Sequence, residues 1–134
     1  TTFVYHSASH RAVKNGGELC HQIDRIHARH FKFLLDTLAG YSTVAGPLVD
    51  QGITVWTNQC GTGNHSYQRV PWLLAGTGNG HLRKGQFIDV GSVTTNRMLN
   101  TLLGAVGVTR SGGAPVDDFG DPALPRGPIA EMLA

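Results

Sequence analysis

The chain has 134 residues, of which 40% are hydrophobic and 15% charged, and its formal net charge is +2. This length and composition indicate one folded, loop-rich domain and argue against a disordered chain. No cluster of basic residues is present, which argues against a nucleic-acid partner. No apolar run approaches the roughly 20 residues that a membrane span requires, so we expect no membrane span.

The first half of the chain predicts a strand, a helix and a second strand. Residues 1–5, TTFVY, have the aromatic and β-branched residues of a strand. The chain opens inside this strand without Met, as expected of a fragment, a processed chain or a domain of a longer protein. Apolar residues recur at helical spacing over residues 19–39, and Gly40 follows as the C-cap glycine. Residues 53–57, ITVWT, predict a short buried strand.

The second half predicts two further strands, a second helix and a tail. Residues 70–76, VPWLLAG, and 86–91, QFIDVG, are the expected strands, and 93–107 is the helix. The expected buried stripe of this helix is Met98, Leu99, Leu102, Leu103 and Val106. We divide the chain into an α/β domain, residues 1–110, and a Pro- and Gly-rich tail, residues 111–134. The tail is expected to wrap the surface or to dock on a neighbour.

The order strand, helix, strand predicts a right-handed crossover between two parallel strands. The first strand ends at His6 and the second at Asn58, so the loops that follow them leave from the same edge of the sheet. Ligands bind at this edge in open α/β sheets. The predicted fold class is therefore α/β, a layered sheet that contains a βαβ unit and has flanking helices.

Three histidines, His6, His10 and His65, are expected to meet at this edge. Three neutral imidazoles are a known ligand set for a catalytic metal, with one position left open for water or substrate. Imidazole ligands favour zinc or copper over magnesium and calcium, which prefer oxygen. We therefore predict a single zinc or copper site. The alternative interpretation of the His-x-x-x-His run is an ordinary polar loop after a strand.

The other histidines and the two cysteines have less specific interpretations. Three histidines are expected to be hydrogen-bonded within the helix or solvated in a turn: His27, His30 and His81. His21, in the first helical turn, fits either a structural or a functional role. Cys20 and Cys60 are expected at the same edge, as a disulfide in an oxidising compartment or as free thiols in a reducing one.

Five segments carry a resemblance to a known family: HSASH, HQIDRIHARHFKFLLDTLA, ITVWTNQCGTGNHSYQRVPWLLAGTGNG, VTTNRMLNTLLGAVG and DDFGDPALP. In this order they resemble the C-terminal part of an uncharacterised bacterial family, domain of unknown function 1552, over almost the whole chain. Members of that family look like exported proteins and are longer than this chain. The resemblance implies an exported protein, periplasmic or extracellular, with a further part upstream.

The order of the parts also resembles the C-terminal half of the alkaline phosphatase and sulfatase superfamily. In that superfamily an Asp-x-x-x-His motif and a later histidine bind one metal, and an Asp-His pair binds a second. His6 and His10 stand at the first motif, and His65 stands at the later histidine. Asn58 and Gln59 stand at the Asp-His pair. Because Asn and Gln are poor ligands, the resemblance implies that one metal site remains.

We consider three functions, the first two of which are implied by this resemblance. The first is a metal-binding domain of an exported alkaline-phosphatase-like protein, with one His-rich site and degenerate catalysis. The second is an active metal-dependent hydrolase of phosphate or sulfate esters, in which Asn58 and Tyr67 orient the substrate. The third is a structural or assembly subunit without metal. The expected partner is the upstream part of the same protein or another chain, with assembly through the C-terminal tail.

Overall fold

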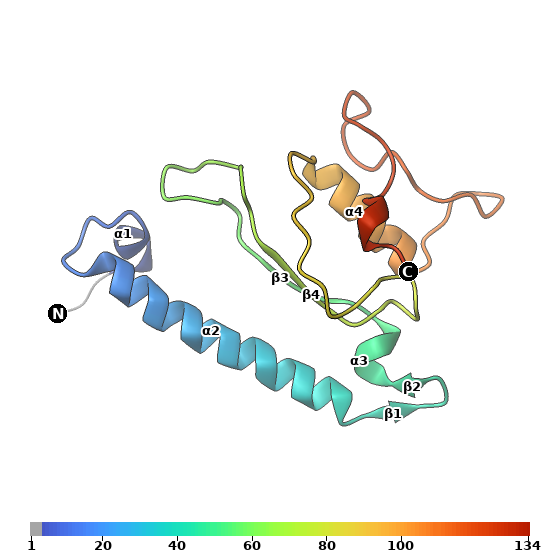
Figure 1. Cartoon of the computed structure of the whole chain (residues 1–134), viewed down its shortest axis with the longest axis horizontal. Coiled ribbons are helices and arrows are strands. Elements are labelled where there is room, and N and C mark those ends of the chain that lie inside the picture. The colour runs from blue at the N-terminus through green and yellow to red at the C-terminus, as the bar shows by residue number, and fades with distance from the viewer. Residues whose placement is uncertain (1–3) are drawn as a thin grey trace. The chain divides into compact units, whose positions relative to one another are not determined.

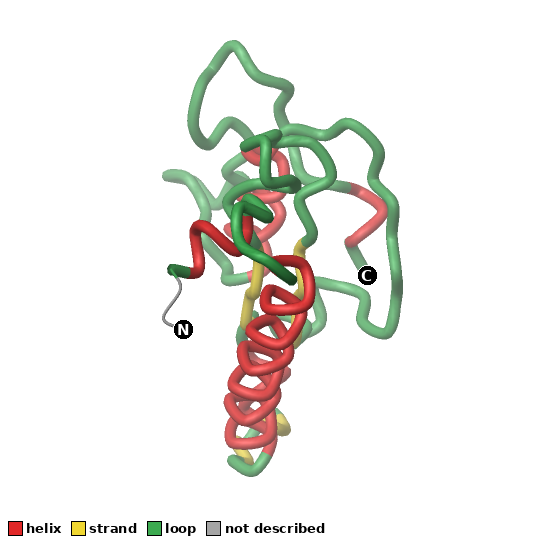
Figure 2. Tube along the Cα trace, turned by 90° about the vertical axis from the view of Figure 1, so that its left-hand side faces the viewer, coloured by secondary structure: helices red, strands yellow, loops and turns green. Residues whose placement is uncertain are grey.

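The computed structural model describes residues 4–134, which form helices and short strand pairs joined by loops (Figure 1). The helices are α1 Tyr5–Ser9, α2 Gly16–Ala39, α3 Leu48–Gln51, α4 Thr95–Ala105 and the 3-10 helix η1 Ala130–Met132. The strands are β1 Ser42–Thr43, β2 Gly46–Pro47, β3 Thr54–Thr57 and β4 Trp72–Ala75. Figure 2 shows the long loops in green and confirms the prediction of a loop-rich chain. Within residues 4–134, no helix combines the length and the apolar character that a membrane crossing requires.

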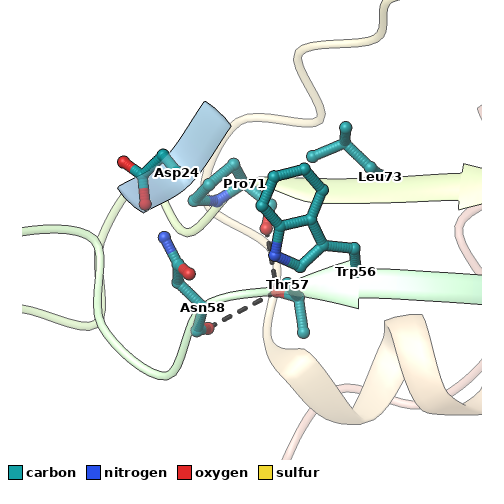
Figure 3. Close-up of a pocket in the computed structure, with 6 residues that line it drawn as sticks. All are labelled: Asp24, Trp56, Thr57, Asn58, Pro71 and Leu73. Carbon is teal, nitrogen blue, oxygen red and sulfur yellow. Dashed lines mark hydrogen bonds between the residues drawn. The ribbon is translucent and has the colours of Figure 1, made fainter. Parts of the chain in front are cut away.

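The strands form two separate antiparallel pairs, which fits the general α/β class. In the first pair Ser42 lies opposite Pro47 and Thr43 opposite Gly46. In the second pair β3 and β4 run in opposite directions (Figure 3). The predicted parallel crossover is therefore wrong for the described residues, because strand β3 pairs with the strand that follows it and not with one that precedes α2. Residues 4–134 by themselves show no layered sheet.

The strand predicted at residues 1–5 falls largely outside the described residues, and a helix begins where it was expected to end. Val4 is extended, but Tyr5–Ser9 is helical. The helix ends in a Schellman motif, in which the amides of Arg11 and Ala12 donate to the carbonyls of Ala8 and Ser7, each at 2.9 Å. This motif closes α1 immediately after His10.

Two compact units contain the described residues, one with residues up to 37 and 56–73, the other with 38–55 and 74–134. In the first unit, α2 confirms the helix predicted over 19–39 and begins slightly earlier, at Gly16. Gly16 packs directly on α1, because a Cβ there would lie 2.9 Å from the carbonyl oxygen of Ala8. Further along α2, the ring of Phe31 lies 5.7 Å from that of Trp56 in β3.

Two of the three remaining strand predictions are confirmed. β3 and β4 fall within the predicted ranges 53–57 and 70–76. The strand expected at 86–91 is not formed, because these residues make a turn instead. The amide of Gly91 donates to the Asp89 carboxylate at 2.9 Å, and Gly91 has a φ of 64°.

Helix α4 confirms the helix predicted over 93–107, but its buried face differs from the predicted apolar stripe. Met98 is buried, whereas Val106 is 58% exposed. Three polar residues of α4 are buried instead: Asn96, Asn100 and Thr101. Because buried polar groups require hydrogen-bond partners, this face is built to hold main-chain groups of another segment.

That segment is the C-terminal tail, which α4 holds through side-chain to main-chain hydrogen bonds. The side chains of Asn96 and Arg97 donate to the carbonyls of Pro125 and Pro128, at 2.8 and 2.6 Å. The hydroxyl of Thr101 accepts a bond of 2.8 Å from the amide of Ile129. These bonds tie the tail to α4 within one unit. The division of the chain into domains at residue 110 stays a prediction.

Candidate functional site

The first unit brings the rings of His6 and His10 together with that of His65, which lies far from them in the chain. The ring centroids of His6 and His10 are 4.5 Å apart, and those of His10 and His65 are 5.0 Å apart. His6 and His65 are 6.5 Å apart. All three side chains are exposed to solvent. The cluster is therefore an accessible group of imidazoles contributed by α1 and by the loop between β3 and β4.

Helix α1 places two of the rings on one face. His6 lies within the helix and His10 is its C-cap residue, so the two are four residues apart and project in the same direction. The Ser9 hydroxyl donates to the His6 carbonyl at 2.7 Å, which fixes the last turn of α1. These histidines were expected to follow a strand, but they lie on a helix. A helix joins them more directly, because neighbours at this spacing face each other.

The loop 58–71 presents the third ring through a tight turn. The amide of His65 donates to the Thr62 carbonyl at 3.1 Å, and His65 has a φ of 59°. Gly63 brings this turn against α1, since a Cβ there would lie 3.0 Å from the Ser9 carbonyl oxygen. The turn therefore sits beside the end of α1, and the imidazole of His65 reaches the two rings on the helix.

Left-handed backbone at non-glycine residues is concentrated in the first unit. Four non-glycine residues of the first unit have φ between 56° and 60°: Arg11, Asn15, His65 and Arg69. Such residues are uncommon outside glycine, and strained backbone of this kind gathers at functional sites. His65 itself is one of the four, so the backbone strain falls on a residue of the cluster.

Gly61→Ala is expected to misplace His65 and to destabilise the loop. A Cβ at Gly61 would lie 1.9 Å from the carbonyl oxygen of Gln68, so one of the two main-chain segments has to move. The bond of 2.8 Å from the Gly61 amide to the Ser66 carbonyl would be lost with it. We expect a destabilisation of about 1–3 kcal/mol, measured by urea unfolding.

Gly17→Ala is the matched control for this prediction. A Cβ at Gly17 meets no atom within 4 Å, and the residue lies in the first turn of α2. Alanine is a better helix former than glycine, so this variant is expected to be unchanged or up to about 1 kcal/mol more stable. Equal stability of the two alanine variants would show that the close approach at Gly61 relaxes without cost.

The spacing of the three rings is close to that of a metal site, but their nitrogens do not yet face a common point. In a tetrahedral site with metal–nitrogen distances of about 2.0–2.1 Å, imidazole centroids lie roughly 5 Å apart. The observed separations of 4.5, 5.0 and 6.5 Å lie on both sides of that value. Among residues 4–134, however, no three His, Cys, Asp or Glu side chains are already arranged to hold a metal ion. Two of the three ring separations are close to 5 Å and the third is wider, so the side chains must move before their nitrogens face a common point.

The other predicted site residues, Asn58 and Tyr67, and the two cysteines differ in their exposure and neighbours. Tyr67 is 77% exposed. Asn58 lines a hollow together with Asp24 and Trp56, and none of the three clustered histidines lines that hollow. Cys20 and Cys60 are free thiols, both half-buried.

The remaining histidines differ from their expected environments. His27 and His30 are exposed on α2, where partly buried, hydrogen-bonded side chains were expected. His81 is half-buried, where a solvated side chain was expected, because its ring packs on the last turn of α4: a Cβ at Gly104 would lie 3.0 Å from His81 Nε2. These three histidines give no second ligand group within the described part of the chain.

No protein-family model, no curated protein and no solved structure matches this chain. The resemblances to domain of unknown function 1552 and to the alkaline phosphatase superfamily therefore stay predictions. The functional inference has to rest on the geometry of the histidine cluster.

Proposed function

We propose that the chain is a metal-binding domain of an exported, alkaline-phosphatase-like protein and that His6, His10 and His65 bind one zinc or copper ion. One observation carries this proposal: three imidazoles from two segments lie with ring centroids 4.5–6.5 Å apart. Three neutral imidazoles are a sufficient ligand set for either ion, with one position open to water or an anion.

We propose that rotation of the side chains turns the cluster into a ligand set. All three histidines are exposed to solvent and their rings lie against one another, so the rings are expected to turn together. The last torsion of a histidine side chain has a broad energy profile, and turning the ring costs little compared with a metal–nitrogen bond. A bound metal would join the end of α1 to the loop 58–71 and hold the two segments together.

We also propose that the chain is related to domain of unknown function 1552 and forms part of a layered, alkaline-phosphatase-like fold. Large apolar side chains on the described residues support a larger assembly: Phe33 is 72% exposed, and Phe87 and Val44 are almost fully exposed. Exposed apolar groups of this size are commonly covered by other protein surface. We propose that the upstream part of the same protein, or a partner chain, covers them.

A structural or assembly subunit without metal is the second candidate, favoured by the same exposed apolar side chains. An active hydrolase of phosphate or sulfate esters has less support, because it requires Asn58 and Tyr67 beside the metal. Asn58 instead lines a separate hollow, and the Tyr67 side chain is largely in solvent.

Metal titration of the full chain tests the proposal. Isothermal titration at neutral pH is expected to show one equivalent of zinc or copper bound, and NMR is expected to show shifts for the imidazoles of His6, His10 and His65. Affinity is expected to fall as the pH is lowered, because protons compete with the metal for the imidazole nitrogens. Magnesium is the control ion and should not bind to these nitrogens. Zinc and copper binding that shifts only His27 and His30 would assign the metal to α2 and contradict the proposed site.

A further inference from the structure

A hollow of about 200 Å³ lies in the first unit, apart from the histidine cluster (Figure 3). Its lining residues are Asp24, Trp56, Thr57, Asn58, Pro71 and Leu73. Figure 3 shows Asp24 and Asn58 on one side, with the indole of Trp56 and the side chain of Leu73 on the other. The hollow therefore combines one carboxylate and one amide with an aromatic and aliphatic wall.

Hydrogen bonds already made in the structure decide which polar groups remain for a ligand. The Thr57 hydroxyl donates to the Pro71 carbonyl at 2.8 Å and lies 3.4 Å from the Asn58 carbonyl. The Thr57 hydroxyl and the Pro71 carbonyl are therefore already hydrogen-bonded within the protein. The Asp24 carboxylate, the Asn58 side-chain amide and the Trp56 indole N–H are the polar groups left for a ligand.

The carboxylate of Asp24 has no cationic partner among the described residues. The ion pairs of residues 4–134 involve Asp36, Asp50, Asp117 and Asp118. The pKa of Tyr5 is raised, mainly by partial burial of the Tyr5 side chain and also by the nearby Asp24 carboxylate and the Cys20 thiol. Asp24 is exposed, so the hollow carries one negative charge at its solvent-facing edge, without an ion-pair partner among residues 4–134.

The indole of Trp56 is the second group in the hollow, after Asp24, that can attract a cation. Indole has the strongest attraction for cations among the aromatic side chains, and a cation within about 6 Å of the ring benefits from it. Phe31 packs against Trp56 at 5.7 Å and holds the ring beside the hollow. An anion would be repelled by Asp24, and a neutral ligand would gain no attraction from its charge.

We propose that this hollow binds an organic ammonium cation, with Asp24 and Trp56 as its principal contacts. The volume is below the roughly 300 Å³ at which pockets for drug-sized ligands begin, so the ligand is a single ammonium head group. The aliphatic wall of Pro71 and Leu73 suits N-methyl groups, and the side-chain oxygen of Asn58 suits an N–H donor. This inference does not depend on the proposed metal site.

NMR of the ¹⁵N-labelled full chain tests the proposal with choline and its neutral isostere 3,3-dimethylbutan-1-ol. The chain has two tryptophans, and Trp72→Phe assigns the two indole N–H signals. Choline is expected to shift the Trp56 signal with a dissociation constant of about 1–10 mM, and the isostere is expected to bind at least tenfold more weakly. Nα-acetyl-lysine amide, titrated in parallel, distinguishes a protein side chain from a free quaternary ammonium as the source of the cation.

Asp24→Asn is the decisive variant, because it removes the charge and keeps the shape. It is expected to raise the dissociation constant for choline at least fivefold, whereas Asp36→Asn, an exposed carboxylate elsewhere on α2, should leave it unchanged. The Asn58 side-chain signals give a second readout that does not depend on the indole. Equal binding of choline and the neutral isostere, or unchanged binding in Asp24→Asn, would overturn the proposal and leave an apolar hollow.

Discussion

His10→Ala is expected to lower the affinity of the chain for zinc or copper by at least about 100-fold. His10 is the central member of the cluster, since its ring lies 4.5 Å from that of His6 and 5.0 Å from that of His65. The remaining two rings are the most distant pair, at 6.5 Å, and two imidazoles leave half of a tetrahedral site to water. Isothermal titration with each metal measures the change.

His30→Ala is the matched control, because His30 is also exposed and helical but lies on α2 outside the cluster. It is expected to bind metal as the parent chain does. His65→Ala provides an independent check through a different segment: loss of binding in both His10→Ala and His65→Ala requires a site shared by α1 and the loop 58–71. If His10→Ala weakens binding and His65→Ala does not, the site is confined to α1 and the three-histidine proposal fails.

Local patterns predicted the two longest helices and the strands β3 and β4, but they missed α1 and α3 and gave the wrong strand pairing. The apolar spacing over 19–39 and 93–107 gave α2 and α4, since a long periodic run has few competing conformations. The predicted parallel pairing failed because it depended on a strand at residues 1–5. A run of five residues carries little information about helix or strand, and the structure places Tyr5 in α1.

The proximity of the three histidines followed from an argument whose topology was wrong. His6 and His10 are neighbours because α1 is helical, and His65 joins them through a tight turn packed on Ser9. The hollow at Asp24 was missed, because a carboxylate on a helix and a tryptophan in a strand form no sequence motif. Only the packing of α2 beside β3, seen in the contact of Phe31 with Trp56, brings the two together.

The polar face of α4 leads to the largest expected change in stability. Asn100 is 2% exposed, and its side chain bonds three main-chain groups of the tail. It donates to the carbonyls of Asp117 and Gly127 at 2.9 and 3.4 Å, and it accepts from the amide of Phe119 at 3.0 Å. Asn100 is not part of the apolar stripe predicted for this helix, so its role was not foreseen.

Asn100→Ala is therefore expected to lower the free energy of unfolding by about 2–4 kcal/mol, because buried partners are left without hydrogen bonds. Hydrogen exchange is expected to accelerate over residues 117–129 and to be unchanged in the backbone of α2. Asn100→Asp keeps an acceptor for the Phe119 amide but loses the donor, so its tail should be released to an intermediate degree at neutral pH. Gln86→Ala, an exposed substitution, should change stability by less than about 0.5 kcal/mol. Unchanged exchange in the tail of Asn100→Ala would mean that the apolar contacts of Ile129 and Met132, both buried, hold the segment without the amide.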